Sequence, residues 1–335
     1  SYMVGIFSFL YFVIRCLSVE NGTWRTLMIN VFRFILCTLL AAGISAFVVI
    51  PTYLQLKSNS LPSFDWNIGN FFKIDLNFVD LIAKFYNGSS HLFDHPNVYG
   101  GLLSLVLFPL FFSDKKIKTI EKISFFLLFL MFILSFQIKG INVIWHAFQE
   151  PTGYTQRFAF LLTFTILYLA FRVYINFDKD QVSQLFKSAL VNIAIIVFLT
   201  AIDSELMSMQ KAIFNILLLV MFTFLLYAKT SGLTNQKLIQ MVLLFVVLAD
   251  VGTNSYLHMR TLYSYPGYNY SRDQYNISTP GFEQIINNIT NNDKGFYRVN
   301  SLIRLTKNDS IRYGYKSMDN FNTLSNGTLH EFMYR

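Results

Sequence analysis

Polar and ionisable side chains gather in one short stretch of the sequence, Ile141–Phe160 (INVIWHAFQEPTGYTQRFAF). The stretch lies between two apolar runs, each long enough to cross a bilayer. Such groups at the mouth of membrane helices are costly unless they face water, a cavity or a ligand. A loop with both signs of charge, amides and aromatic rings suits a sugar or a phosphate. The alternative is an aromatic belt at the membrane interface with an arginine that extends to water.

Six side chains of this stretch form the predicted substrate-binding set: Trp145, His146, Gln149, Glu150, Tyr154 and Arg157. The guanidinium suits bidentate contact with a phosphate, and the imidazole could donate to that phosphate or relay a proton. The two aromatic rings could stack on a sugar, and the amide and carboxylate could bond its hydroxyls. Each also has an ordinary explanation as an interfacial, packed or solvated residue.

The polar connection Lys57–Tyr99 supplies the acidic candidates, which are Asp65, Asp75, Asp80 and Asp94. Asp80 opens Val79–Phe85, a short amphipathic helix expected to lie on the membrane, where the carboxylate could simply favour the helix N-terminus. The predicted catalytic candidates are Asp80, Asp94 and His146. Asp250, near the outer end of the last apolar run, could face a cavity or the interface.

His91 and His95 flank Asp94 at a spacing that would place both imidazoles on one face of a helix, as in some metal sites. However, Pro96 and the preceding NGSS predict a loop, and no third ligand is evident. The sequence therefore assigns no metal site, although a divalent cation is possible as a cofactor.

Composition places the chain in a membrane. Of its 335 residues, 53% are hydrophobic and only 14% are charged, too few to coat a soluble surface of this size. The net charge of +8 would suggest a nucleic-acid partner in a soluble protein. Here the basic residues lie in short loops between apolar runs, so membrane orientation explains them better and no nucleic-acid partner is expected.

About 20 helical residues cross a bilayer core, and eight apolar runs are candidates. They are 2–17, 27–56, 98–112, 123–138, 157–177, 189–202, 212–228 and 238–256. The fold class predicted is an all-α polytopic membrane protein with about eight transmembrane helices, occupying residues 1–256. Lys and Arg concentrate after alternate runs, as in Lys115, Lys116, Lys118 and Lys122. The positive-inside rule then puts loops 57–99 and 139–157 and the C-terminal segment outside.

Residues 257–335 change in character, since Tyr, Asn, Asp and Ser replace Leu and Phe. Phe282–Ile289 could form a short helix, and Phe296–Leu305 alternates as a strand does. This segment is expected to begin an extracytoplasmic α+β domain that is cut off at Arg335. Because the chain opens without Met inside an apolar run, we interpret it as an internal fragment of a longer protein.

Four segments in order resemble the bacterial YfhO family of polytopic membrane proteins: NFVDLIAKFYNGS, HPNVYGGLLSLVLFPLFF, KGINVIWHAFQEPTGYTQRFAF and FYRVNSLIRLTKNDSIRYGY. The resemblance spans nearly the whole chain. Members usually show a stretch of the type W-H-G-F-Q-x-P-N-x-F-P-Y-R-F-S-F. This chain has Ala147 in place of that glycine, and Thr152–Gln156 in place of N-x-F-P-Y.

The resemblance implies a glycosyltransferase of the GT-C type in the bacterial cell membrane. Such enzymes move a sugar from a polyprenyl-phosphate-linked donor to a cell-envelope acceptor, which for this family is associated with lipoteichoic acid. In GT-C enzymes an acidic residue of the first outside loop commonly acts as base or metal ligand. That loop would precede Ser1, so the main catalytic carboxylate is expected upstream of this chain.

Two other functions fit the sequence. A transporter or flippase for a lipid-linked sugar would need a polar path through the membrane, yet charges within the apolar runs are scarce. A non-catalytic assembly protein would use the outer segment to dock envelope enzymes. An acidic first outside loop upstream of Ser1 would favour the enzyme over both alternatives.

Overall fold

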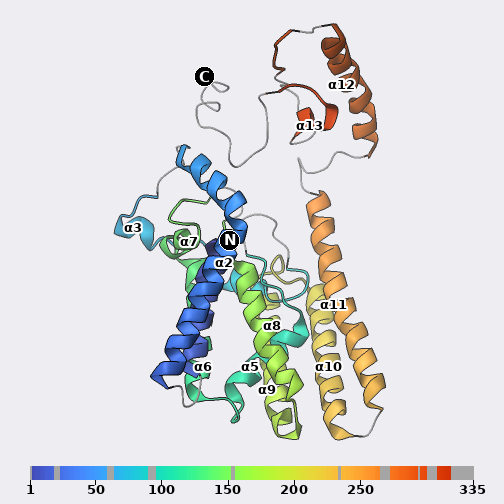
Figure 1. Cartoon of the computed structure of the whole chain (residues 1–335). Helices are drawn as coiled ribbons and strands as arrows, with labels where there is room; N and C mark the ends of the chain where they lie inside the picture. Colours follow the sequence, from blue (N-terminus) through green and yellow to red (C-terminus); the bar gives the residue numbers. More distant parts are fainter. Residues whose placement is uncertain are drawn as a thin grey trace. The chain divides into compact units, whose positions relative to one another are not determined.

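Each apolar run of the sequence forms a helix in the computed structural model (Figure 1). The structure describes residues 2–18, 23–58, 64–89, 96–151, 155–232, 235–264, 272–292, 295–299 and 308–317. The helices that contain the runs are listed here with their bounds: α1 (Tyr2–Ser18), α2 (Trp24–Ser58), α5 (Leu102–Ser113), α6 (Thr119–Gln137), α8 (Ala159–Ile175), α9 (Val182–Ile202), α10 (Met209–Ser231) and α11 (Gln236–Ser264).

Five stretches of helix are long and apolar enough to cross a membrane: Trp24–Leu54, Thr119–Gln137, Lys179–Ile202, Met209–Ser231 and Gln236–Leu262. Helices α1, α5 and α8 are apolar but shorter. The 12 residues of α5 span only about 18 Å at the rise of an α-helix, well below the thickness of a bilayer core. The structure therefore supports a multi-pass membrane protein with five candidate spans, and the expected number of eight is not confirmed.

The chain divides into two compact units, of which the first comprises Ser1–Met28 and Ser63–Leu262. Helix α5 lies at the centre of this unit and packs against α8, α9 and α10. Its side chains are buried on several faces, including Leu102, Val106, Leu110 and Phe111. A short helix that is apolar all round is stable in such a site because neighbouring helices cover every face.

The first unit also contains shorter helices. They are α3 (Ile68–Phe71), α4 (Phe78–Ala83), α7 (Lys139–Trp145) and the 3₁₀ turn η1 (Lys179–Gln181). The sequence predicted the α4 helix but placed it on the membrane surface. Leu81 and Ala83 belong to the hydrophobic core and Lys84 at the end of the helix is 3% exposed, so one face of α4 packs inside the protein.

A buried ion cluster joins three helices of the first unit. The Glu121 carboxylate of α6 lies 2.5 Å from the guanidinium of Arg172 in α8 and 3.5 Å from that of Arg15 in α1. Glu121 is buried, so these two cations compensate a charge that would otherwise be costly away from water. The cluster fixes the ends of α1, α6 and α8 relative to one another.

The second unit comprises Ile29–Pro62 and Tyr263–Arg335. It holds α12 (Arg272–Asn292) and α13 (Asp309–Tyr313). The predicted helix Phe282–Ile289 lies within the longer α12. Val299 and Ser317 form an isolated parallel bridge, and the described residues contain no longer strand. Residues 300–305 of the predicted strand lie outside the described residues, so the α+β domain is not confirmed. The predicted boundary at 256 falls inside α11, which continues to Ser264.

Candidate functional site

A short backbone bridge brings the first polar loop to the start of the central one. Helix α6 ends at Gln137, where Ile138 turns to an extended conformation and pairs antiparallel with Ile74. The Asp75 amide donates to the Gln137 carbonyl at 2.8 Å, and the Lys139 amide donates to the Lys73 carbonyl at 3.0 Å. Asp75 and Lys139 are thereby held beside each other. Helix α3 packs against α7 on the same side (Figure 1).

A cavity of about 270 Å³ opens where these segments meet. Its lining is mostly polar and comprises Asp75, Lys139, Asn142, Val143, Glu150, Pro151, Thr155 and Gln156. Most of these residues come from the stretch between α6 and α8, whereas Asp75 comes from the first polar loop. The cavity therefore depends on tertiary structure that joins residues far apart in sequence.

Both signs of charge face this cavity. The Lys139 ammonium lies 2.5 Å from the Glu150 carboxylate, and both side chains are partly exposed. Partial burial raises the pKa of the Asp75 carboxyl, while a hydrogen bond from Asn142 and the charges of Lys139 and Lys73 oppose that rise. A ligand that donates hydrogen bonds to such a carboxyl group would stabilise its ionised form.

Two buried amide groups among the residues that line the cavity each have an oxygen without a hydrogen-bond partner. Gln156 is 7% exposed, and its Nε2 donates to the Phe136 carbonyl at 3.3 Å. Asn142 is 2% exposed, and its side chain bonds to Asp75. Neither Asn142 Oδ1 nor Gln156 Oε1 has a hydrogen-bond partner among the described residues. Buried acceptors are rarely left unpaired, so these oxygens favour a ligand rich in hydroxyl donors.

Glu150 is the member of the predicted substrate-binding set that lines the cavity. Gln149 and Arg157 are exposed nearby in sequence, and Tyr154 lies outside the described residues. Of the catalytic candidates, Asp80 lies in the first turn of α4 and does not line the cavity, and Asp94 lies outside the described residues.

Trp145 is a core residue. Its indole is 3% exposed and stacks on Phe132 and Phe158, with ring centroids 5.4 and 5.0 Å away. Its Nε1 donates to Ser135 Oγ at 3.0 Å. Both polar and aromatic contacts of the indole are thus made within the protein, and the packing favours a structural role over the predicted contact with a sugar.

His146 is half-buried at the end of α7. Its Nδ1 bonds to the Asn142 carbonyl at 2.9 Å, which fixes the ring, and its Nε2 is buried without a partner in the described part of the chain. Burial lowers the pKa of this imidazole. A neutral imidazole with one free nitrogen can accept or donate a proton, although His146 does not line the cavity.

The sequence analysis named Asp75 as an acidic candidate but did not choose it as a site residue, and it did not choose Lys139, Asn142 or Gln156. The change from apolar to polar residues immediately after α6 could have indicated the last three. The bridge that brings residues 73–75 to 137–139 has no such local signal.

A family model for the bacterial membrane protein YfhO matches residues 1–335, the whole of this sequence. This chain belongs to the YfhO family. No curated protein and no solved structure matches it.

The backbone of the stretch 141–160 turns sharply at Ala147, where this chain lacks the glycine usual in the family. Ala147 and Phe148 have φ values of +57° and +64°, in the left-handed region. An L-residue there costs about 1–2 kcal/mol, whereas glycine enters at no steric cost. The glycine usual at the position of Ala147 therefore has a physical reason, and this YfhO chain carries strain at the entrance to its cavity loop.

Asp250 forms a second polar cluster, inside the helices. It is 1% exposed and accepts hydrogen bonds from the Leu102 amide and from Asn87 Nδ2, both at 2.9 Å, and from the Tyr99 hydroxyl. Asp250 thus caps the N-terminus of α5, whose own N-cap residue, Gly101, has no side chain to do so. It also borders a largely apolar cavity of about 190 Å³.

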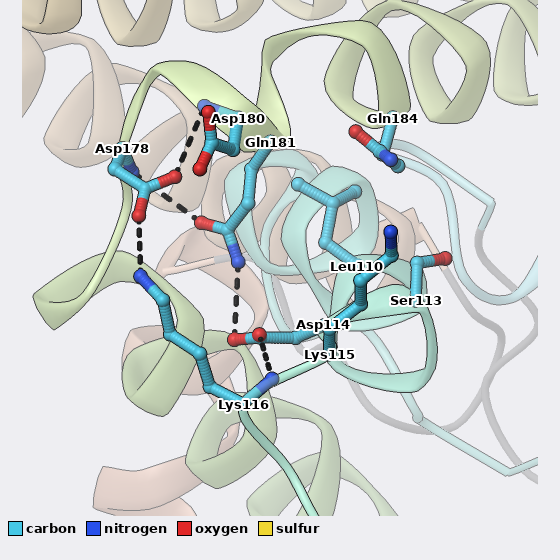
Figure 2. Close-up of a pocket in the computed structure, with 9 residues that line it drawn as sticks. All are labelled: Leu110, Ser113, Asp114, Lys115, Lys116, Asp178, Asp180, Gln181 and Gln184. Atoms are coloured by element: carbon cyan, nitrogen blue, oxygen red, sulfur yellow. Dashed lines mark hydrogen bonds and ion pairs between the residues drawn. The ribbon is translucent and has the colours of Figure 1, made fainter.

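A third polar pocket, of about 220 Å³, lies between the α5–α6 turn and η1 (Figure 2). Lys116 Nζ pairs with Asp178 Oδ2 at 2.5 Å, and Gln181 Nε2 donates to Asp114 Oδ2 at 3.2 Å. The hydrogen bond to Lys116 lowers the pKa of the Asp178 carboxyl. These two contacts join the α5–α6 turn to η1, and we call this site the clamp. In the described residues, no group of three or more His, Cys, Asp or Glu could hold a metal ion.

Proposed function

We propose that this YfhO chain is part of a membrane glycosyltransferase. The enzyme moves a sugar from a polyprenyl-phosphate-linked donor to a cell-envelope polymer such as lipoteichoic acid, on the outer face of the membrane. Family membership supports a multi-pass membrane protein, and the resemblance described above supports the reaction class. The observation that carries the proposal is the polar cavity beside α7, with its two unpaired amide oxygens.

The cavity suits a sugar by its balance of groups. A pyranose offers several hydroxyl donors on one small ring, and Asn142 Oδ1, Gln156 Oε1 and Asp75 offer acceptors. The Lys139 ammonium, paired with Glu150, can donate to ring or hydroxyl oxygens. In this proposal the residues bind and orient a sugar, and Asp75 accepts a hydrogen bond from one of its hydroxyls.

If the protein were a transporter, the Asp250 cluster would be the candidate for a polar group on the substrate path. A transporter needs polar groups that a substrate can reach along its path. The Asp250 carboxylate instead accepts three donors from the protein and is buried. The cavity beside α7 is lined by residues with unpaired acceptors, and this difference supports transfer chemistry over passage through the helices.

The test uses the full-length gene in its own host. Sugar substitution of purified lipoteichoic acid would be measured by mass spectrometry in wild type, in a deletion strain, and in strains complemented with Asp75→Asn, Gln156→Ala or Arg157→Ala. Deletion should abolish the substitution. Asp75→Asn and Gln156→Ala should reduce it about 10- to 100-fold, because each removes one bond of a buried or charged group to the sugar.

Asp178→Asn is the matched control, since it makes the same carboxyl-to-amide change in the clamp between α5 and η1, away from the cavity. It should retain substitution, with equal protein in the membrane by immunoblot. If the polymer stays substituted after deletion, the lipoteichoic acid assignment fails. If deletion removes the sugar but all the cavity variants restore it, the cavity is not the sugar site.

A further inference from the structure

Exposed apolar side chains gather around α3, outside the candidate membrane spans. Trp66, Ile68, Phe72, Ile74 and Phe148 are each between 47% and 79% exposed. The first four belong to the connection between α2 and α5, and Phe148 follows α7 in the cavity loop. A cluster of large apolar side chains that water can reach marks a contact surface, because its burial is favourable. We call these five residues the apolar patch.

Ring contacts join the patch across the sequence. The centroid of the Trp66 indole lies 6.0 Å from that of the Phe148 ring and 6.2 Å from that of the Phe71 ring. The Phe71 ring in turn lies 5.0 Å from the Phe72 ring. The α3 segment and the cavity loop therefore contribute to one continuous aromatic surface.

The patch begins where a candidate membrane span ends. Helix α6 is long and apolar enough to cross a bilayer, and side chains such as Leu127 and Leu134 are exposed along it, as expected of a helix that contacts lipid. Ile138, the residue after α6, pairs with Ile74 of the patch. Helix α3 lies beside α7 at this end of α6 (Figure 1). The patch thus extends an apolar surface past the end of the span, toward the level of the lipid headgroups.

The support of the patch is fixed by close packing. A Cβ on Gly140 of α7 would lie 2.1 Å from the ring of Phe71, so this ring packs directly on the backbone of α7. Only a glycine allows an approach of this kind. The hydrogen bonds between residues 73–75 and 137–139 hold the segment that follows α3. The exposed side chains are therefore carried by a segment that the protein itself positions.

The polar groups of the α3 segment bond to one another. The Asn67 side chain caps α3 by accepting a hydrogen bond from the Asn70 amide at 2.7 Å, and its Nδ2 donates to the Asp65 carboxylate at 2.5 Å. Asn70 Nδ2 donates to the Asp65 carbonyl at 2.8 Å. Residues 66–72 carry no charged side chain. Because amide groups that are already paired lose little on leaving water, this segment can enter the headgroup region at low cost.

We propose that the apolar patch inserts into the membrane–water interface of the leaflet at the Gln137 end of α6. Its partner is the lipid bilayer, at the boundary between headgroups and acyl chains where aromatic side chains concentrate. The exposed Lys73, between Phe72 and Ile74, can extend its ammonium group to the water side of this boundary.

The insertion has a consequence for the cavity beside α7. Helix α7 carries both the support of α3 and two residues of the cavity lining, Lys139 and Asn142, so the cavity would lie close to the membrane surface. None of the five patch residues lines the cavity. The proposal therefore does not depend on the proposed transfer reaction.

The test is electron paramagnetic resonance of the full-length protein in nanodiscs, with a nitroxide label at one cysteine at a time. The background carries Cys16→Ser and Cys37→Ser, with any other native cysteine also replaced. Labels on Ile68→Cys and Phe72→Cys report collisions with two reagents. Oxygen concentrates in the bilayer, whereas a polar nickel chelate stays in water.

Two reference positions calibrate the labels. Leu127→Cys, on an exposed position of α6, is the lipid reference, and Glu205→Cys, on the exposed turn between α9 and α10, is the water reference. The ratio of oxygen to nickel accessibility at Ile68→Cys and Phe72→Cys should be several-fold higher than at Glu205→Cys and lower than at Leu127→Cys.

Trp66 gives a second measurement without a label. Its emission is the difference in fluorescence between wild type and Trp66→Phe, a variant that keeps an aromatic ring in the patch. This emission should be quenched in nanodiscs of phospholipids brominated near the headgroup end of the acyl chain, compared with the same lipids without bromine.

Three results would overturn the proposal. Nickel accessibility at the patch equal to that at Glu205→Cys would place it in water. Labels that neither reagent reaches would show that protein covers the patch, either a second copy of this chain or another partner. Trp66 emission that brominated lipids leave unchanged would contradict insertion directly.

Discussion

Removal of the Asp250 carboxylate should be among the most destabilising single changes in the first unit. Asp250→Ala would leave the Leu102 amide, Asn87 Nδ2 and the Tyr99 hydroxyl without their shared acceptor. Each unsatisfied buried donor costs about 1–3 kcal/mol. The costs are not independent, because the three donors surround one group and can relax together. We therefore expect a loss of about 3–5 kcal/mol, the range for breaking a buried charged contact.

Asp250→Asn separates charge from shape. The amide keeps one oxygen but replaces the other by an NH₂ group, which cannot accept from Leu102 or from the pair Asn87 and Tyr99. One side of the contact is lost, so the expected cost is about 1–3 kcal/mol. The order of stability should be wild type, then Asp250→Asn, then Asp250→Ala.

The assay is reversible unfolding of the purified full-length protein in mixed micelles, followed by tryptophan fluorescence. Asp180→Ala serves as the control, because that side chain is exposed and exposed charges contribute little to stability. If Asp250→Ala unfolds at the wild-type denaturant concentration, the carboxylate does not hold α5, and the cluster must be explained by function.

Three smaller perturbations test other parts of the structure. Gly140→Ala should destabilise the protein by about 1–3 kcal/mol, since its Cβ would lie 2.1 Å from the ring of Phe71. Gly252→Ala is the control and should not destabilise it, because nothing lies within 4 Å of a Cβ there. Equal unfolding midpoints for the two variants would contradict the packing of α3 on α7. Ala147→Gly should stabilise by about 0.5–1 kcal/mol, as relief of the left-handed strain exceeds the added unfolded-state entropy; a lower midpoint would show that the strain is absent. Burial lowers the pKa of His146, so the unfolded chain binds more protons and stability should fall as pH drops through about 6.5, the ordinary value for histidine. His146→Gln should flatten that profile, and an unchanged slope from pH 7.5 to 5.5 would refute it.

The helices were predictable because their signal is local. Runs of apolar residues indicate membrane helices whatever their neighbours are, and each predicted run overlaps one helix of the structure. The first residue of α5 was harder to predict. Gly101 has a φ of +85°, so the helix begins at Leu102 rather than at Val98. The Leu102 amide at this start donates to the Asp250 carboxylate, which lies about 150 residues away in sequence. No local sequence pattern predicts that contact.

The position of the cavity loop also follows from a local signal. The stretch 141–160 does border the cavity, because polar residues after an apolar run must lie at the end of a helix. Its aromatic residues were harder to assign, since Trp145 has the same sequence signal whether it stacks on a sugar or on Phe132 and Phe158. The structure decides through burial.

Buried polar atoms without a partner occur at three polar sites in the described part of the chain. Gln184 Oε1 in the pocket of Figure 2 and Asn87 Oδ1 beside Asp250 lack donors, although the carboxylates of both sites have partners inside the chain. Beside α7, two such oxygens, Asn142 Oδ1 and Gln156 Oε1, belong to residues that line one cavity. A fold under selection for stability alone would lose such groups, because replacing a buried unpaired polar group by an apolar one is neutral or favourable. The presence of two of them beside the α7 cavity therefore supports the proposal of a ligand that carries hydroxyls.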